Sequence, residues 1–203
     1  MRGLFVTFEG IDRSGKTTQA QLLERALGSD AVAVREPGGT DLGERVRELV
    51  KDARLDPGAR AEALLFAAAR AELVDEVIRP ALDAGRVVIS DRFLDSSLAY
   101  QGSARGLGVE EVERINHFAT DGIVPDLTFL LEIDPVDAAA RAGMLDRFED
   151  EGLGLQRTVA QAYDRLAEAE PGRWRRIDGA RPSASIHEEV AAAVEAARSG
   201  ARA

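Results

Sequence analysis

The chain has 203 residues, no cysteine, two histidines and a formal net charge of −10 at pH 7. Disulfide bonds and a thiolate metal site are excluded, two histidines are too few for a typical histidine-based zinc site, and the acidic balance argues against binding nucleic acid. No apolar run approaches the length of a membrane span and the N-terminus leads straight into a strand, so we expect a cytoplasmic protein with one domain (residues 1–203) and no membrane partner.

The first two predicted elements frame a phosphate-binding motif. Residues 4–8 are typical of a short buried strand, and residues 18–27 of a helix with its leucines along one side. Between them, residues 10–17 fit G-x-x-x-x-G-K-[ST]. A glycine-rich turn between a strand and a helix is the context in which this motif cradles phosphate groups. The alternative is a plain turn of a dinucleotide-binding fold, in which the Lys16-Thr17 pair has no role.

The motif assigns chemistry to particular residues. Glycines let backbone N–H groups converge on phosphate oxygens, Lys16 would reach the β- and γ-phosphates of ATP, and the Thr17 hydroxyl would bind Mg²⁺. The residues expected to bind the ATP phosphates are Gly10, Asp12, Arg13, Ser14, Gly15, Lys16, Thr17, Thr18 and Arg141.

Strand and helix patterns alternate along the rest of the chain, which predicts an α/β fold with a parallel sheet. The further strands are expected at residues 31–35, 87–90, 127–132 and 174–177. The further helices are expected at 41–51, 59–78, 94–103, 109–120, from Pro135 onward, at 156–170 and at 186–198. Asp41 is expected to cap the first of these at about its start, and Pro80 to end the second. Residues 141–154 are charged, contain several glycines and are weakly patterned, so we interpret them as a lid, and we expect fraying from Ser199 onward.

Polar side chains follow the strands, and in open parallel sheets ligands bind at this end. Asp91 comes directly after an apolar strand, in the position from which a carboxylate reaches the Mg²⁺ of a nucleoside triphosphate, and Arg92 beside it would meet phosphate. A strand-end ion pair is the alternative. A guanine-specific switch would need an Asn-Lys-x-Asp motif, but the single asparagine, Asn116, precedes His117. This favours transfer of a phosphoryl group from ATP to a second substrate.

Four segments together resemble the thymidylate kinase family. They are Phe8-Glu9-Gly10-Ile11-Asp12, Arg35-Glu36-Pro37-Gly38-Gly39-Thr40, Leu64-Leu65-Phe66-Ala67-Ala68-Ala69-Arg70, and the run from Asp91-Arg92-Phe93 to Tyr100-Gln101-Gly102. They occur in the family's order and span residues 8–102. The resemblance implies a three-layer P-loop kinase fold, with a five-stranded parallel sheet flanked by helices and a short lid.

The resemblance also implies a site for dTMP. Phe66 would stack on the thymine ring, Arg70 would donate to its O4 atom, and Ser97 and Gln101 would border the base. A core aromatic and a solvated charge are the alternatives for Phe66 and Arg70, which share one helix face. Asp12 would accept a hydrogen bond from the 3′-hydroxyl group of the sugar, and Tyr100 would pack near C2′.

Arginines would grip the acceptor phosphate, because the planar guanidinium binds phosphate in a bidentate way. The candidates are Arg35, Arg47 and Arg92, with Pro37 in the adjoining loop. Members of the family differ in whether the phosphate loop or the lid supplies the cation of the transition state. We expect Arg13 to be the main catalytic cation and Arg147 the second, beside Lys16, Asp91 and Arg92.

The expected reaction is ATP plus dTMP giving ADP plus dTDP, with Mg²⁺, in support of dTTP synthesis. One alternative is a P-loop kinase for another nucleotide or a deoxynucleoside. Another is a non-catalytic nucleotide-binding module, which would be expected to have lost Lys16, Thr17, Asp91 or Arg92. Homodimers are usual in the family, and we expect one here, although the Ala-rich helix at 59–78 that could support it is as typical of a packed core.

Overall fold

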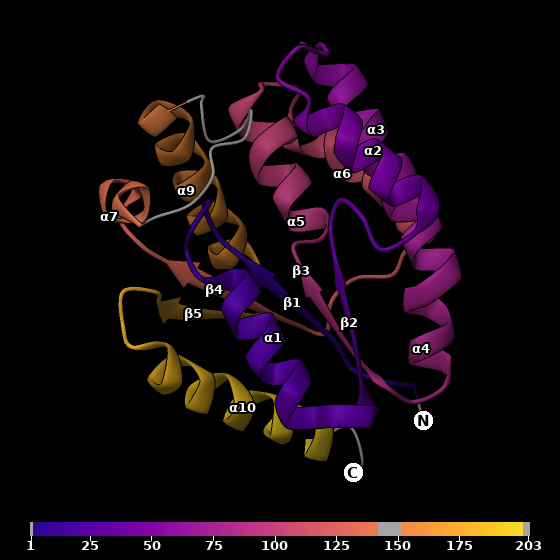
Figure 1. The fold of residues 1–203 in the computed structure, drawn as a ribbon, viewed down its shortest axis with the longest axis vertical. Helices are drawn as coiled ribbons and strands as arrows, with labels where there is room; N and C mark the ends of the chain where they lie inside the picture. Colours follow the sequence, from indigo (N-terminus) through magenta and orange to yellow (C-terminus); the bar gives the residue numbers. More distant parts are fainter. Residues whose placement is uncertain (1, 142–151, 201–203) are drawn as a thin grey trace.

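A computed structural model describes residues 2–141 and 152–200, and a parallel sheet of five strands runs through this part of the chain (Figure 1). The strands are β1 (Phe5–Glu9), β2 (Ala31–Arg35), β3 (Val87–Asp91), β4 (Leu127–Glu132) and β5 (Trp174–Asp178). They lie in the order β2-β3-β1-β4-β5, and every neighbouring pair is parallel. The predicted sheet is confirmed, with shifts of one residue at the ends of β1, β3 and β5.

Burial along the strands follows their place in the sheet. The central strand β1 is buried at every residue, whereas the edge strands β2 and β5 alternate between buried and more exposed positions. Central strands of parallel sheets are covered on both faces and therefore contain nearly continuous apolar runs. Successive side chains of β1 point to opposite faces, so Val6 and Phe8 enter one core cluster while Phe5 enters another.

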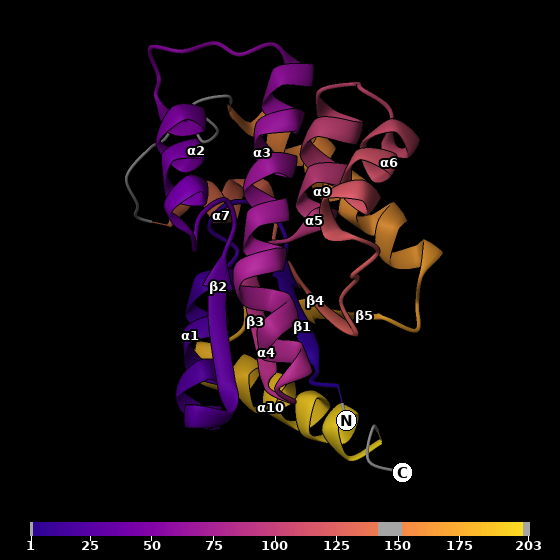
Figure 2. The ribbon, with the colours of Figure 1, turned by 90° about the vertical axis from the view of Figure 1, so that its right-hand side faces the viewer.

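Helices cover both faces of the sheet and make the fold three-layered (Figures 1 and 2). They are α1 (Lys16–Leu27), α2 (Asp41–Lys51), α3 (Ala59–Leu73), α4 (Arg79–Asp83), α5 (Leu94–Ser97), α6 (Val109–Thr120), α7 (Pro135–Ala140), α9 (Gly152–Ala169) and α10 (Ser183–Gly200). A 3₁₀ turn at Gly28–Asp30 and two π-helical segments, Val74–Ile78 and Leu98–Ala104, complete the described elements. Helices α1 and α10 pack together on one face, and their apolar residues join Val6 and Phe8 in one core cluster.

The prediction that Pro80 ends the long helix is wrong. The helix continues from α3 through the π-helical segment Val74–Ile78 into α4, which contains Pro80 in its first turn. In a regular α-helix the proline ring would clash with the carbonyl group of Glu76. The wider π-helical turn, closed by a bond from Arg79 N–H to the Val74 carbonyl, precedes this point, and such a turn relieves the conflict.

Four other helix starts differ from the prediction: α1 and α10 begin two and three residues earlier than expected, and α2 and α9 also differ. Thr40, not Asp41, caps α2, because Thr40 has an extended backbone and its hydroxyl accepts from Gly43 N–H at 3.0 Å. Helix α9 starts at Gly152, four residues before the predicted start and within the last residues of the expected lid. Asp134 caps α7, and Pro135 takes its first position as predicted.

Among the described residues, no helix combines the length and apolarity that crossing a membrane requires.

Candidate active site

The glycine-rich loop between β1 and α1 has the backbone of a phosphate-binding loop. Gly10, Arg13 and Gly15 have positive φ angles of 137°, 61° and 105°. A Cβ atom at Gly10 would lie 2.6 Å from the Leu131 carbonyl oxygen, so only glycine fits against β4. Helix α1 begins at Lys16, and its free N–H groups therefore face the same space as the loop.

Lys16 is folded back onto this loop. Its Nζ atom donates to the Ile11 carbonyl at 2.6 Å and to Ser14 Oγ at 3.4 Å, and the side chain is buried. Burial, with a further contribution from Arg92, lowers the pKa of Lys16 to about 8. A phosphate at the loop would restore the usual preference for the charged form, because an adjacent anion favours the ammonium group.

Thr17 and Asp91 lie together at the sheet edge. The Thr17 hydroxyl donates to Asp91 Oδ2 at 2.5 Å, which brings the first turn of α1 to the end of β3. Both are oxygen ligands of the kind that Mg²⁺ prefers, and this ion commonly keeps water and nucleotide oxygens as its other ligands. Among the described residues, no group of three or more His, Cys, Asp or Glu side chains could hold a metal ion, so this pair is the better fit for a nucleotide-bound ion.

A cavity of about 490 Å³ opens beside the phosphate-binding loop. It contains every residue expected to bind dTMP except Arg70. Its lining residues are Asp12, Arg13, Lys16, Thr17, Arg35, Glu36, Pro37, Arg47, Val50, Lys51, Phe66, Asp91, Arg92, Ser96, Ser97, Tyr100 and Gln101. The same cavity is thus lined by Lys16 of the phosphate-binding loop and by Phe66 of helix α3.

Arg92 is one of the residues that line the cavity. Its guanidinium group donates to Asp12 Oδ1 at 2.5 Å and lies over the Tyr100 ring, 5.2 Å from its centre. The Tyr100 hydroxyl donates to Asp12 Oδ2 at 3.2 Å. Burial by itself raises the pKa of Asp12, but attraction by Arg92 and Lys16 outweighs this effect, so the pKa lies below its usual value and the carboxylate stays ionised.

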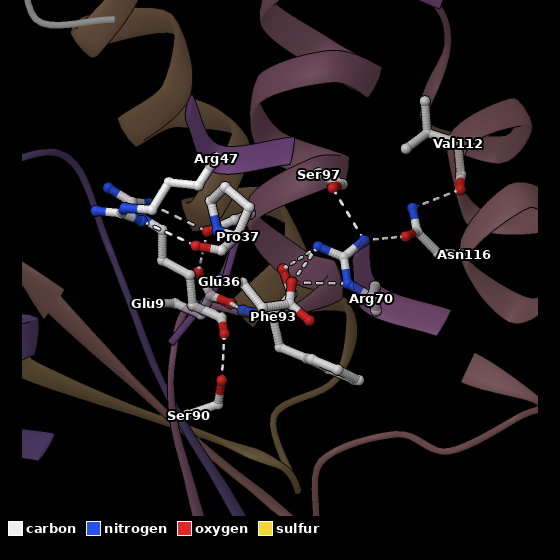
Figure 3. A network of polar contacts seen from close by, with 12 residues as sticks. Glu9, Glu36, Pro37, Arg47, Arg70, Ser90, Phe93, Ser97, Val112 and Asn116 are labelled. Carbon is white, nitrogen blue, oxygen red and sulfur yellow. Dashed lines mark hydrogen bonds and ion pairs between the residues drawn. The ribbon is translucent and has the colours of Figure 1, made fainter. Parts of the chain in front are cut away.

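Arg70 lies just behind the cavity and is 1% exposed. Its five N–H groups are all directed at protein oxygens (Figure 3). Nε and Nη2 donate to Glu36 Oε2, Nη2 also to the Phe93 carbonyl, and Nη1 to Ser97 Oγ and to Asn116 Oδ1. Two of its partners, Glu36 and Ser97, line the cavity, so to donate to a thymine O4 atom Arg70 would have to exchange a bond such as the 3.1 Å contact with Ser97.

The remaining predicted arginines of the acceptor site are tied to the β2–α2 loop. Arg35 forms a bidentate pair with Glu44 at 2.9 and 2.8 Å, and Arg47 donates to the Pro37 carbonyl at 2.9 Å. Gln101, on the π-helical segment, donates to the buried Glu62 at 2.9 Å. These contacts fix the side chains at the cavity rim.

The side chains of Arg13 and Arg141 each donate a hydrogen bond to the backbone carbonyl of the other residue. Arg13 Nη1 donates to the carbonyls of Arg141 at 2.9 Å and Ala139 at 3.2 Å, while Arg141 Nη1 donates to the Arg13 carbonyl at 2.9 Å. Arg141 also reaches the Gly179 carbonyl at 2.7 Å. The phosphate-binding loop is thereby fastened to the end of α7 and to the turn after β5. The other predicted catalytic arginine, Arg147, lies outside the described residues.

Sequence reasoning missed four side chains that hold this site. Gln156 spans Asp12, accepting from its N–H at 3.2 Å and donating to its carboxylate at 2.7 Å. Glu9 accepts hydrogen bonds from Ser96 and Tyr163 directly beneath Arg92. A carboxylate ending an otherwise apolar strand was a usable signal for Glu9. Gln156 and Tyr163 lie on α9, where the sequence carries no motif.

The first strand of the five-stranded parallel sheet leads into a phosphate-binding loop, and Lys16, Thr17 and Asp91 line the cavity beside this loop. This arrangement defines a P-loop kinase fold. The sequence model of the family "Thymidylate kinase" matches residues 8–190. The chain is 46% identical to the thymidylate kinase of Caldanaerobacter subterraneus subsp. tengcongensis, with 100% of both chains covered. It is 50% identical to that of Leifsonia xyli subsp. xyli, covering 93% and 92% of the two chains. The crystal structure of thymidylate kinase from Ehrlichia chaffeensis superposes with a TM-score of 0.79 at 33% identity, covering 96% of this chain and 99% of that one. The chain belongs to the thymidylate kinase family.

Proposed function

We propose that the chain transfers the γ-phosphoryl group of ATP to dTMP, in support of dTTP synthesis. The observation that carries this proposal is the cavity beside the phosphate-binding loop. It joins Lys16 and Thr17, which suit a triphosphate, to Arg92, Tyr100 and Phe66, which suit a nucleotide already carrying one phosphate. Family membership supports the same reaction.

In this proposal the two phosphate groups meet between the loop and Arg92. Lys16 and Arg13 serve the triphosphate, while Arg92, with Arg35 and Arg47 at the rim, holds the acceptor phosphate. The residues Thr17 and Asp91 would hold Mg²⁺, which supplies charge neutralisation at the phosphates when bound. No general base is needed, because the attacking phosphate is already an anion. The chain's own contribution is to align two anions and to exclude water.

At the nucleoside end, the proposal assigns the base to Phe66 and the sugar to Asp12 and Tyr100. Asp12 suits a hydroxyl group because its carboxylate stays ionised and is held by Gln156. Ser97 and Gln101 lie where the edge of a base stacked on Phe66 would be read. We also propose a cytoplasmic location, where the pools of both nucleotides are found.

The test is ADP release with ATP, Mg²⁺ and each of dTMP, dUMP, dCMP and thymidine. Loss of one methyl group from the base is worth roughly 10–200-fold in an apolar pocket, whereas a site that hydrogen-bonds the base edge rejects cytosine by roughly 10⁴–10⁵. We expect dTMP to react fastest, dUMP slowly, and dCMP and thymidine hardly at all. Chelation of the metal should stop turnover and added Mg²⁺ should restore it. Equal rates with dTMP and dCMP would contradict the proposed base site.

We further propose that two copies of the chain form a homodimer. Helix α3 lies between α2 and α6 (Figure 2), and each of these three helices has exposed large apolar residues. Leu42 and Leu49 of α2 are 43% and 47% exposed, Leu64 of α3 is 57% exposed, and Phe118 of α6 is 89% exposed. Exposed apolar side chains gathered on neighbouring helices are typical of a protein interface.

A further inference from the structure

Arg92 rests on a buried carboxylate to which it makes no direct hydrogen bond. Glu9, the last residue of β1, is 0% exposed. Its Oε2 atom accepts from Ser96 Oγ at 2.6 Å and from the Tyr163 hydroxyl at 2.8 Å. Arg92 Nη1 in turn donates to the same two hydroxyl oxygens, at 3.1 and 3.3 Å. The two hydroxyl groups therefore lie between the carboxylate and the guanidinium group.

We infer that Glu9 is a positioning residue that aims Arg92 at the acceptor phosphate, acting through the hydroxyl groups of Ser96 and Tyr163. The inference rests on the proposed function in one respect, namely that Arg92 binds this phosphate. It adds three residues to the acceptor site, from β1, α5 and α9, none of which reaches the phosphate group itself in this scheme.

The direction of the protons supports the inference. Guanidinium nitrogens only donate hydrogen bonds, so both hydroxyl groups must face Arg92 with a lone pair. Glu9 Oε2 accepts the protons that would otherwise point at Arg92. The Ser96 and Tyr163 oxygens are 2.9 Å apart, so one hydroxyl can also donate to the other, and this too leaves a lone pair for Arg92.

Glu9 also fixes the backbone that carries Arg92. Arg92 has a φ angle of +71°, which a residue with a side chain rarely adopts. Its carbonyl accepts from Ser90 Oγ at 2.6 Å, and the next residue, Phe93, donates its N–H to Glu9 Oε1 at 2.8 Å (Figure 3). A strained residue next to a binding cavity persists only when its surroundings hold it, and Glu9 is part of that support.

A second buried carboxylate shows what an ordinary ion pair looks like here. Asp95 is also 0% exposed, and Arg173 donates to its two oxygens at 2.6 and 3.0 Å. Both oxygens of Glu9, by contrast, accept from neutral donors, and burial raises the pKa of Glu9 to about 7. Burying a carboxylate without a direct ion pair lowers the stability of the folded state, so its presence here indicates a role at the site.

The test is a set of variants assayed for the KM of dTMP, the KM of ATP and kcat at pH 8, above the raised pKa of Glu9, where the carboxylate is ionised. In Glu9→Gln the new NH2 group either directs a proton at Phe93 N–H, which is itself a donor, or faces the two hydroxyl groups and removes the acceptor of their protons. We expect the KM of dTMP to rise about tenfold, the size of one charge-assisted hydrogen bond, with the KM of ATP within about twofold of the parent. Ser96→Ala with Tyr163→Phe should produce a similar rise.

The triple variant separates positioning from general loosening of the fold. If Glu9 acts through the hydroxyl groups, adding Glu9→Gln to Ser96→Ala/Tyr163→Phe should change the KM of dTMP by no more than about twofold. A full further tenfold rise would overturn the inference, as would a Glu9→Gln enzyme with an unchanged KM for dTMP. Should Glu9→Gln fail to fold, an unchanged KM in the double hydroxyl variant overturns it. Asp126→Asn is the matched control, because Asp126 also accepts a backbone N–H, from Phe5 at 2.7 Å, but is not among the residues that line the cavity; it should leave the KM of dTMP alone.

Arg92→Met distinguishes failure of the inference from failure of the proposed function. No turnover of dTMP by the parent enzyme would refute the proposed function. An unchanged KM for dTMP in Arg92→Met would remove Arg92 from the acceptor site and the inference with it. A raised KM in Arg92→Met, with parental values in the Glu9 and hydroxyl variants, would overturn the inference alone.

Discussion

Replacing Arg70 with methionine should destabilise the protein much more than replacing a surface arginine. Arg70 and Glu36 form an ion pair in which the two side chains are 1% and 4% exposed. Removing one partner of a buried pair leaves an uncompensated charge and typically costs about 3–5 kcal/mol. Methionine has a comparable length, so the loss of packing adds little. We therefore expect the free energy of unfolding to fall by about 3 kcal/mol or more at pH 8.

The loss should depend on pH and on Glu36. Burial raises the pKa of Glu36, against the opposing attraction of Arg70, so without Arg70 the pKa rises further. The orphaned carboxyl group can then take up a proton at pH 5, where the loss should be smaller than at pH 8. In a Glu36→Gln background no carboxylate is left without its partner. Arg70→Met should therefore lower the free energy of unfolding clearly less than in the parent.

Urea unfolding followed by the fluorescence of Trp174, the single tryptophan, measures these differences. The control is Arg79→Met, because Arg79 pairs with Asp121 on the surface, where the two side chains are 36% and 82% exposed. We expect this control to lie within about 1 kcal/mol of the parent. A loss below about 1 kcal/mol for Arg70→Met, or the same loss with and without Glu36, would refute the assignment of a buried charge pair.

Three further predictions concern catalysis, titration and assembly. Arg13→Ala should lower kcat by about 10³ or more with little change in the KM of dTMP, and a loss below about tenfold would contradict a role as the transition-state cation. Because burial raises the pKa of Glu9 from 4.5 to about 7, the folded state keeps a proton that the unfolded chain has released between these values. The free energy of unfolding should thus decline as pH rises from 4.5 to 7. In urea titrations, Glu9→Gln should reduce this decline by up to about 1.4 kcal/mol per pH unit. An unchanged dependence on pH would count against the shifted pKa. Phe118→Asp should convert the proposed dimer into monomers in sedimentation experiments, whereas Val136→Asp on α7 should not, and equal behaviour of the two would move the interface elsewhere.

The parts of the fold that local chemistry determines could be predicted from the sequence. Strands β1 to β4 are short, mainly apolar runs that end in polar residues, and the loop around Lys16 is a contiguous motif. The course of the chain through Pro80 could not be predicted, because it depends on the π-helical turn that precedes the proline. The cap at Thr40 was misassigned by one residue, because both Thr40 and Asp41 suit that position and only the backbone angles decide.

The support of the site was harder to foresee than the site itself. Apart from Arg70, the residues expected around dTMP line one cavity. Those that follow strand ends, such as Arg35 and Arg92, meet at one edge of the sheet, whereas Phe66 comes from helix α3. The partners of Arg70, by contrast, come from four separate segments, and a sequence pattern does not specify such a set. Gln156 and Tyr163 contact the site only because α9 packs across it, which is a tertiary fact without a local signal.

The hydrogen bonds of Glu9 and those of the Arg70–Glu36 pair both hold the backbone of Phe93. This shared role of the two networks explains why the carboxylates of Glu9 and Glu36 are both buried. The N–H of Phe93 is held by Glu9 and its carbonyl by Arg70, which is itself neutralised by Glu36. Phe93 follows Arg92, whose left-handed backbone conformation would otherwise relax. Arg92 lines the cavity and donates to Gly10 and Asp12 of the phosphate-binding loop, and because Phe93 follows it in the chain, the direction of its side chain depends on both networks. Loosening either network should therefore displace the same guanidinium group, so variants of Glu9 and of Arg70 should be less than additive in their effect on the KM of dTMP.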